Sequence, residues 1–182
     1  DAIVTTVQTE KPHRATAWQR FIHTGPLAFL PLAGDREQRH CSIVWSVVTN
    51  EAERLMGLSE TQFNDALTHA FESKLGAVRS SDKRFRVPLR QRHATEYFRN
   101  GIVLVGDAAH SIHPLAGQGV NLGFLDVMAL GEELHAGLNA GRQVSDTRIL
   151  ERYQRRRKPH NLRMMWVMEG FKHLFAGRTP AT

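Results

Sequence analysis

Asp107 is the side chain whose setting in this sequence most clearly suits ligand binding. It follows the apolar run 102–105 and a glycine, Gly106. Such a run is typical of a strand buried on both faces, and open α/β sheets bind ligands beyond the carboxyl ends of their strands. Gly106 permits a sharp exit because it has no Cβ. A carboxylate at this place can accept hydrogen bonds from the hydroxyl groups of a ribose-type or ribityl chain.

A helix is expected to begin shortly after Asp107. Gly117, Gln118 and Gly119 precede the apolar stretch 120–134, which predicts a helix over 118–138 that is buried all round in its first half. The first turn of a helix has N–H groups without intrahelical partners and a partial positive charge, which suits an electron-rich ligand. Glycines let the backbone approach such a ligand closely, and Pro114 stiffens the loop before them.

The run Gly-Asp-Ala-Ala-His at 106–110, followed by Pro-Leu-Ala-Gly-Gln-Gly-Val-Asn at 114–121, resembles the second flavin-binding motif of the FAD-dependent aromatic hydroxylases. This is the para-hydroxybenzoate hydroxylase-like group, and the ubiquinone-biosynthesis flavin hydroxylases are the closer match. The resemblance implies that Asp107 contacts the ribityl chain of FAD, that Pro114 lies against a face of the ring, and that the helix start lines the pyrimidine edge. The cofactor-binding residues would be Asp107, Pro114, Gly117, Gln118, Gly119, Val120 and Asn121.

The resemblance also implies an activity. FAD would be reduced by NADH or NADPH, and O2 would supply the oxygen that is placed on an electron-rich ring, here a polyprenylated phenol or quinol of ubiquinone biosynthesis. A substrate pocket would lie near Phe29, Leu30, Pro31 and Leu32, although ordinary core packing explains each of these residues equally well. The sequence has no Ser-His-Asp triad or paired carboxylates, so no catalytic residue is identified.

The elements around the motif indicate an α+β fold, a fragment of an α/β FAD-binding hydroxylase fold. Strands are expected over 2–9, 13–23, 27–32, 41–49 and 84–89, and the alternation in 41–49 indicates a mostly antiparallel sheet built from hairpins. The sequence also predicts a turn at Gly25-Pro26 and an edge position or a strand end at Pro31. A capping box is expected at 59–62, and a helix is expected to stop at Gly76. Asp146 is expected to cap a last helix that Pro159 ends or kinks.

Three regions follow from this pattern. Residues 1–97 form the substrate-domain sheet and helices, 98–140 the second FAD-binding motif as a strand, loop and helix, and 141–182 a C-terminal helical segment. A Gly-x-Gly-x-x-Gly fingerprint is absent from the sequence. We therefore expect that the N-terminal dinucleotide-binding portion is missing, that the chain is the C-terminal portion of a hydroxylase, and that it is inactive alone.

The composition limits which covalent links, ligands and partners the protein can have. The single cysteine excludes an internal disulfide and fits a reducing, cytoplasmic setting.

The net charge of +6 comes largely from residues 152–158, which we interpret as the solvated face of a helix. The sequence contains no nucleic-acid-binding module. His110 and His113 lack further ligands at metal spacing, so no metal is expected, and these side chains are expected to hydrogen-bond locally or to face the cofactor. The apolar segment 162–175 is expected to pack as a helix on the body of the protein or to form an apolar surface for partner proteins or a prenyl tail. With the basic helix, it leaves open a peripheral association with the inner membrane face or a biosynthetic complex.

Two other functions remain open at this point. The first is another flavoprotein of the same group, such as a halogenase, an epoxidase or a geranylgeranyl reductase. The second is a non-catalytic module that binds a membrane or a partner through the basic helix and the apolar segment.

Overall fold

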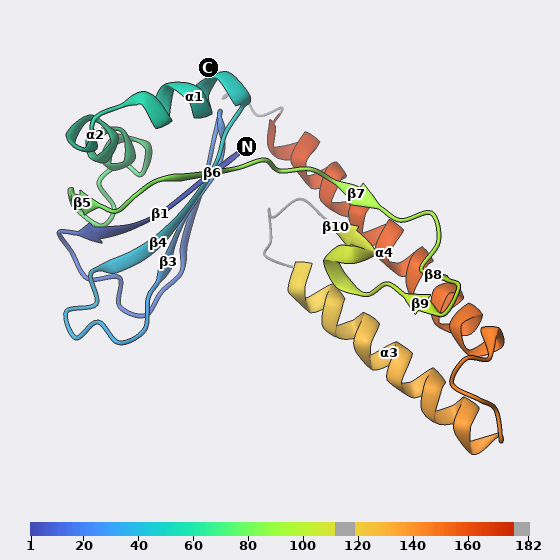
Figure 1. Ribbon diagram of the computed structural model, residues 1–182. Helices are drawn as coiled ribbons and strands as arrows, with labels where there is room; N and C mark the ends of the chain where they lie inside the picture. The colour runs from blue at the N-terminus through green and yellow to red at the C-terminus, as the bar shows by residue number, and fades with distance from the viewer. Residues whose placement is uncertain (112–118, 177–182) are drawn as a thin grey trace. The chain divides into compact units, whose positions relative to one another are not determined.

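The computed structural model describes the backbone of residues 1–111 and 119–176 and side chains as far as residue 170. The chain divides into two compact units, Asp1–Leu89 and Arg90–Thr182 (Figure 1). Helices and antiparallel strands are mixed, which confirms the α+β class. The division falls after Leu89, whereas the sequence placed a boundary after residue 97 and a second one after residue 140.

The first unit is built on an antiparallel sheet. Its main path has the order β2-β3-β4-β1-β5, and β6 also pairs with β1. The strands are β1 (Ala2–Thr9), β2 (Trp18–Ile22), β3 (Gly25–Pro31), β4 (His40–Ser46), β5 (Val78–Ser81) and β6 (Phe85–Val87). The long β1–β4 pairing, from Ala2↔Ser46 to Gln8↔His40, fixes which side chains share a face. The predicted sheet of hairpins is therefore confirmed.

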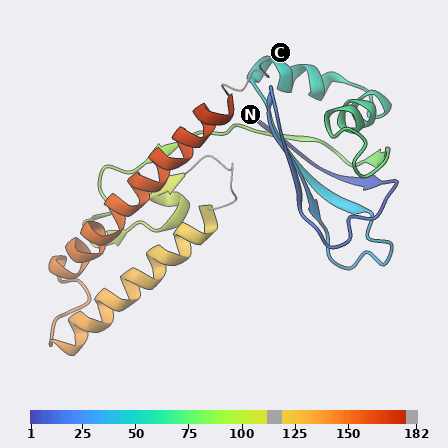
Figure 2. The same cartoon turned by 180° about the vertical axis from the view of Figure 1, so that it is seen from behind.

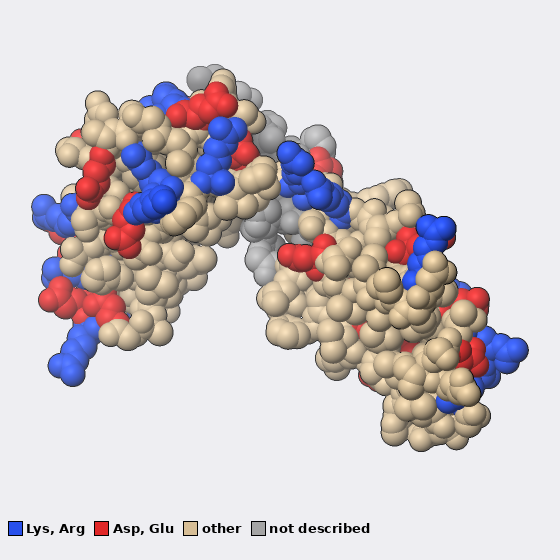
Figure 3. Space-filling view, viewed as in Figure 1, with Lys and Arg blue, Asp and Glu red and all other residues tan. Residues whose placement is uncertain are grey.

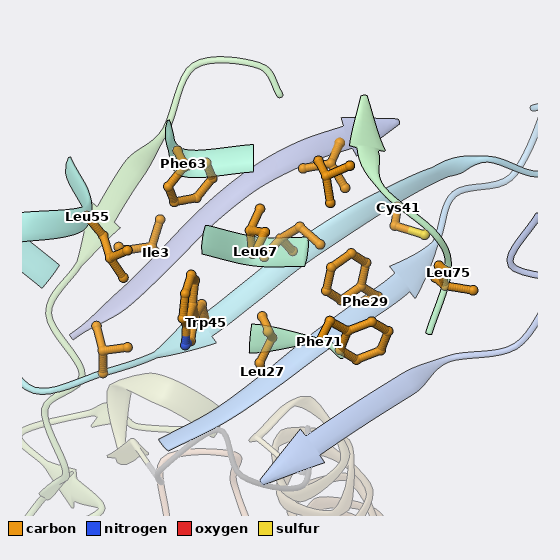
Figure 4. Packing of buried hydrophobic residues seen from close by; sticks show 14 of the residues in the cluster. Ile3, Leu27, Phe29, Cys41, Trp45, Leu55, Phe63, Leu67, Phe71 and Leu75 are labelled. Carbon is orange, nitrogen blue, oxygen red and sulfur yellow. The ribbon is translucent and has the colours of Figure 1, made fainter. Parts of the chain in front are cut away.

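Two helices, α1 (Thr49–Gly57) and α2 (Glu60–Ala70), pack on one face of this sheet (Figures 1 and 2). Alternate residues of β1, β3 and β4 point into the core beneath them, and Phe29 stacks on Phe71 with ring centroids 4.1 Å apart (Figure 4). Burial of so much apolar area is the main stabilising contribution to this unit. The core includes Ile3, Val7, Leu27, Phe29, Cys41, Ile43, Trp45, Leu55, Phe63, Leu67 and Phe71.

The hairpin between β2 and β3 turns at His23-Thr24, because Ile22 already pairs with Gly25. The turn predicted at Gly25-Pro26 is therefore displaced by two residues. Gly25 is needed for a different reason. Its φ is +135°, and a Cβ there would lie 2.2 Å from the carbonyl oxygen of Ser46 on the neighbouring chain segment.

The helix signals of this unit are partly confirmed. Ser59 and Gln62 form the predicted capping box at the start of α2. The helix ends at Ala70 rather than at Gly76, because the chain turns through left-handed positions at Glu72 and Ser73 first. Helix α1 was not predicted; its N-cap, Val48, makes no side-chain capping bond, so the usual start signal is missing.

The second unit consists of two long helices and short strand pairs. Helices α3 (Gly119–Asn139) and α4 (Thr147–Ala176) lie side by side in both ribbon views (Figures 1 and 2). The remaining elements are β7 (Arg92–His93), β8 (Phe98–Arg99), β9 (Ile102–Val103), the 3₁₀ turn η1 (Gly106–Ala108) and β10 (His110–Ser111). Strand β7 pairs with β10, and β8 pairs with β9.

Three expectations for this unit need correction. The run 102–105 is not a strand buried on both faces: β9 ends at Val103, and Ile102 is 67% exposed because β8 is its only strand partner among the described residues. Helix α3 is not buried all round, since Val120, Phe124 and Met128 are about 60% exposed. Helix α4 does not end at Pro159 but continues through it to Ala176.

Candidate functional site: the Gly106–Ala108 turn and the start of helix α3

The site begins with the tight turn η1, which follows β9 and precedes β10. Gly106 has a φ of +57°, a left-handed conformation that glycine adopts without a steric penalty. The amide of Ala109 closes the turn by donating to the carbonyl oxygen of Gly106 at 2.8 Å. Asp107 is therefore presented at the tip of the turn, where its side chain is exposed.

Asp107 lies beside the first residue of α3. A Cβ placed on Gly119 would lie 3.9 Å from Oδ1 of Asp107, so the two are separated by little more than the missing side chain. Among the described residues, none donates a hydrogen bond to this carboxylate. The structure therefore brings together a carboxylate with free acceptor positions and the positive end of a long helix, as the sequence predicted.

The turn and the helix approach each other through glycine. A Cβ on Gly123 would lie 3.3 Å from Cα of Gly106, and a Cβ on Gly106 would lie 3.5 Å from Cα of Gly123. These distances are at or inside ordinary van der Waals contact. Larger side chains at either position would move the turn away from α3 and with it the carboxylate of Asp107.

A buried polar cluster, here called the Asp126 cluster, lies directly behind the turn. It comprises Asp126 on α3, His110 on β10, and Arg157 and Asn161 on α4. One carboxylate oxygen of Asp126 accepts from the amide of Gly106 at 3.0 Å and lies 2.5 Å from Nε2 of His110. The other accepts from Nε of Arg157 at 2.7 Å and from Nδ2 of Asn161 at 3.0 Å. The carboxylate of Asp126 thus connects α3 with η1, β10 and α4.

The Asp126 cluster continues toward β7 through Tyr97. Asn161 donates to the hydroxyl of Tyr97 at 3.1 Å, and that hydroxyl lies 3.0 Å from Nε2 of His93. The pKa of Tyr97 is raised, with burial as the largest cause, so the phenol stays protonated. Burial and the nearby charges of Lys158 and His110 lower the pKa of His93. A neutral His93 can then accept the hydrogen bond of the phenol.

Asp126 stays ionised although it is fully buried. Burial alone would raise its pKa, but hydrogen bonds from His110, Arg157, Asn161 and Gly106 together hold the pKa well below its usual range. The charge of Arg157, which is 5% exposed, compensates the carboxylate. Breaking such a buried ion pair strongly destabilises the fold, because removal of one partner leaves an uncompensated charge in the interior.

Sequence reasoning missed this cluster. Residues 152–158 were interpreted as a solvated basic face, which is wrong for Arg157, and Lys158 donates to the carbonyl oxygen of Thr95. The available signal was Asp126 itself, an acidic residue within the apolar stretch 120–134. His110 was expected to hydrogen-bond locally or to face the cofactor, whereas its Nε2 lies 2.5 Å from Asp126, sixteen residues further along the chain on α3.

The other predicted site residues are placed as follows. Gly119, Val120 and Asn121 form the first turn of α3, whereas Pro114, Gly117, Gln118 and His113 lie outside the described residues. Phe29 is 1% exposed in the core against Phe71, so it belongs to the packing beneath the helices and not to an open surface (Figure 4). Pro31 is the half-buried last residue of β3, and Leu30 and Leu32 are exposed.

The residues present fit the phosphate-free part of a flavin. A ribityl chain offers hydroxyl donors for the free oxygens of Asp107, and the absence of a side chain at Gly119 leaves room beside that carboxylate. The positive end of α3 is suited to an electron-rich heterocycle edge. Metal chemistry has no comparable support in the described part of the chain, where no three His, Cys, Asp or Glu side chains gather. None of the helices described there is both long and apolar enough to cross a membrane.

Comparison with known proteins agrees with this fit. The chain is 38% identical over 193 aligned residues to the ubiquinone biosynthesis monooxygenase COQ6 of Drosophila melanogaster, covering 89% of this chain and 40% of that protein. It is 38% identical over 174 residues to the 3-demethoxyubiquinol 3-hydroxylase of Escherichia coli, covering 96% of this chain and 43% of that protein. The chain therefore spans about two fifths of the length of these curated relatives.

Solved structures show the same fold. PqsL, a probable FAD-dependent monooxygenase from Pseudomonas aeruginosa, superposes with a TM-score of 0.71 at 20% identity, covering 97% of this chain and 48% of that chain. The profile of the family described as FAD binding domain matches residues 2–166, which include the turn, the start of α3 and the whole Asp126 cluster. The chain therefore belongs to the FAD binding domain family.

Proposed function

We propose that this chain forms the flavin-ring half of the FAD site in a monooxygenase that hydroxylates a polyprenylated phenol or quinol of ubiquinone biosynthesis. The observation that carries the proposal is the exposed carboxylate of Asp107 beside the glycine that opens α3. The names of the relatives from Drosophila melanogaster and Escherichia coli support the substrate class.

We further propose that a dinucleotide-binding portion completes the site in the polypeptide that carries this chain. The share of the relatives that the chain spans supports this division. So does the surface of α3, where six large apolar side chains are exposed, and Figure 3 shows few charged groups over this helix. These side chains are Val120, Phe124, Leu125, Val127, Met128 and Leu138.

In this site the protein binds and orients the cofactor. FAD supplies the redox chemistry when it is bound, with NADH or NADPH as reductant and O2 as the oxygen source. Asp107 accepts hydrogen bonds from ribityl hydroxyls and so fixes the position of the ring along the turn. The first turn of α3, with Gly119, Val120 and Asn121, directs its amide groups and partial positive charge toward the pyrimidine edge of the ring. Pro114, Gly117 and Gln118 are proposed to complete this edge.

The substrate pocket is proposed to involve Leu30, Pro31 and Leu32 but not Phe29. Leu30 lies on the sheet face opposite α2, because it neighbours Phe29, which points into the core. Its exposed apolar side chain suits contact with a ring or a prenyl tail. Apolar walls of this kind also exclude water from the reacting centre.

The decisive experiment measures FAD affinity and product formation with the polypeptide that carries this chain. Asp107→Asn keeps the shape of the side chain but removes its charge. We expect about 10- to 100-fold weaker FAD binding, because hydrogen bonds to a charged acceptor contribute about 1.5–3 kcal/mol. Flavin fluorescence quenching gives the dissociation constant, and mass spectrometry with ¹⁸O₂ tests for one labelled oxygen atom in a prenylated phenol.

Asp65→Asn is the matched control, because Asp65 is an exposed acid on α2, in the other compact unit. It should leave FAD binding unchanged. An unmodified polypeptide that binds no FAD, or an Asp107→Asn variant that binds it with wild-type affinity, would contradict the assigned site. FAD binding without labelled product from any prenylated phenol would remove the proposed substrate class alone.

A further inference from the structure

We propose that Asp126 is a positioning residue for the cofactor site, in which it clamps the Gly106 amide so that the carboxylate of Asp107 faces the start of α3. The inference rests on the proposed function for the identity of the ligand. Its geometry is independent of that function. The amide that Asp126 holds is the one immediately before Asp107, at 3.0 Å from the carboxylate.

The position of Asp126 on α3 makes the clamp effective. Asp126 follows Gly119 by two helical turns, so both residues lie on the same side of the helix. Gly119 is next to the Asp107 side chain, and Asp126 holds the amide of Gly106. One helix therefore lies against two successive residues of the turn: Gly119 is next to Asp107, and Gly123 and Asp126 contact Gly106.

The hydrogen bonds around Asp126 also fix its own orientation. His110 lies on the oxygen that accepts from Gly106, while Arg157 and Asn161 occupy the other oxygen. Asn161 is itself held by Arg157, whose Nη2 donates to Oδ1 of the amide at 2.9 Å. With donors on both oxygens, the carboxylate cannot rotate without losing several bonds, so the Gly106 amide has one preferred place.

Stability alone gives a weak reason for such a cluster. A buried ion pair can often be replaced by apolar residues of similar volume without loss of stability, because desolvating two charges costs about as much as their attraction returns. Apolar residues in place of the Asp126 cluster could not accept the hydrogen bond of the Gly106 amide. Only an acceptor can hold the Gly106 amide, and only an ionised one attracts four donors at once.

The first experiment compares Asp126→Asn with Glu132→Gln in the polypeptide that carries this chain. Glu132 is also an acid on α3 that pairs with an arginine of α4, Arg156, but this pair is exposed and does not touch the turn. We expect Asp126→Asn to weaken FAD binding about 10-fold or more, because the amide group of asparagine must turn a donor toward either Gly106 or Arg157. Glu132→Gln should change the affinity by less than about twofold.

A second variant separates positioning from folding. The double substitution Asp126→Asn with Arg157→Gln leaves no unpaired buried charge, so it should fold even if the single variant does not. We expect the double variant to lose FAD affinity to a similar extent. A variant that unfolds at lower urea concentration but binds FAD like the wild type would reduce Asp126 to a structural role and overturn the proposal.

The Gly106 amide provides a readout without the cofactor. In ¹H–¹⁵N spectra of the wild type, this amide should resonate at low field and exchange slowly with solvent, and both properties should be lost in either Asp126 variant. Fast exchange of the Gly106 amide in the wild type would also overturn the clamp. If the wild type shows a protected Gly106 amide but binds no FAD, the clamp stands and the proposed function fails. If FAD binds equally to wild type and variants, the clamp alone fails.

Discussion

Asp107 lies in the turn and Asp126 lies behind it, and the surroundings of these two carboxylates give them opposite roles. Asp126 is fully buried and accepts from four donors, so it has no capacity left for a ligand. Asp107 is exposed and receives no hydrogen bond from the described residues. A rigid buried acceptor and a free exposed one are what a binding site needs, since the first fixes the backbone from which the second acts.

Cys41 provides a residue-scale test of the first unit. It is fully buried in β4, and burial, with a smaller contribution from the charge of Asp35, raises the pKa of its thiol to about 11. We expect the folded protein to resist a thiol-reactive disulfide reagent at pH 8, because the reactive thiolate is scarce and covered. In urea the single cysteine should react fully. Rapid stoichiometric labelling of the folded protein at pH 8, followed by absorbance, would contradict the buried position.

The same thiol gives a direction for stability against pH. Its folded pKa lies above the unfolded value of about 9, so the unfolded chain loses this proton first as the pH rises. The contribution of Cys41 to stability is therefore complete below about pH 9 and is lost between about pH 9 and pH 11. Cys41→Ala should flatten this part of the stability curve measured by urea unfolding.

The sequence predicted the residues of the turn better than the residues behind it. Asp107 could be found because strand, glycine and acid follow one another along the chain. Asp126 and Arg157 meet only when α3 and α4 pack, so no local pattern reveals the pair. The buried Arg157 stands in a run of basic residues that are mostly exposed, and burial within such a run is decided by tertiary contacts.

At the scale of elements, the crossing of α3 and α4 depends on a missing side chain. A Cβ on Gly137 would lie 2.2 Å from Cδ1 and 2.6 Å from Cγ1 of Ile149, which is itself buried. We expect Gly137→Ala to destabilise the protein by about 1–3 kcal/mol, because overpacking outweighs the gain in helix propensity. Urea unfolding followed by circular dichroism measures the change.

Gly131 is the matched control on the same helix, because nothing lies within 4 Å of a Cβ placed there. Gly131→Ala should raise stability by up to about 1 kcal/mol through helix propensity alone. Adding Ile149→Val should recover part of the loss in Gly137→Ala, since the substitution removes Cδ1. Equal effects of alanine at Gly137 and Gly131 would show that the two helices do not cross at this distance.

Local signals predicted some elements well and failed where packing decides. The capping box of α2 and the alternation in β4 are complete within a few residues, so both were found from the sequence. Pro159 lies inside α4 even though it cannot donate a backbone hydrogen bond. Anchors on both sides explain the continuous helix: Tyr153 donates to the carbonyl oxygen of Leu104, and Asn161 bonds to Asp126.

At the scale of the molecule, the described residues leave an apolar surface of α3 exposed to solvent. Leu122 and Ala129 are buried, but Phe124 and Met128 are 63% and 60% exposed. An apolar stretch in a sequence indicates burial without saying by what, which is why the prediction of a helix buried all round is wrong for the described chain. This apolar surface of α3 suits packing against the proposed dinucleotide-binding portion.

The double substitution Phe124→Ser with Met128→Ser tests this packing by comparing two contexts. In the 182-residue chain alone, we expect the free energy of unfolding to change by less than about 1 kcal/mol and the binding of a hydrophobic dye to fall, because both side chains face water there. In a polypeptide with a dinucleotide-binding portion, each substitution should cost about 2–5 kcal/mol and weaken FAD binding, because buried apolar side chains are lost. Leu122→Ser, at a position that is 3% exposed on the same helix, should destabilise both forms and serves as the control. If the double substitution is harmless in both contexts, the surface of α3 stays uncovered and the proposed packing is wrong.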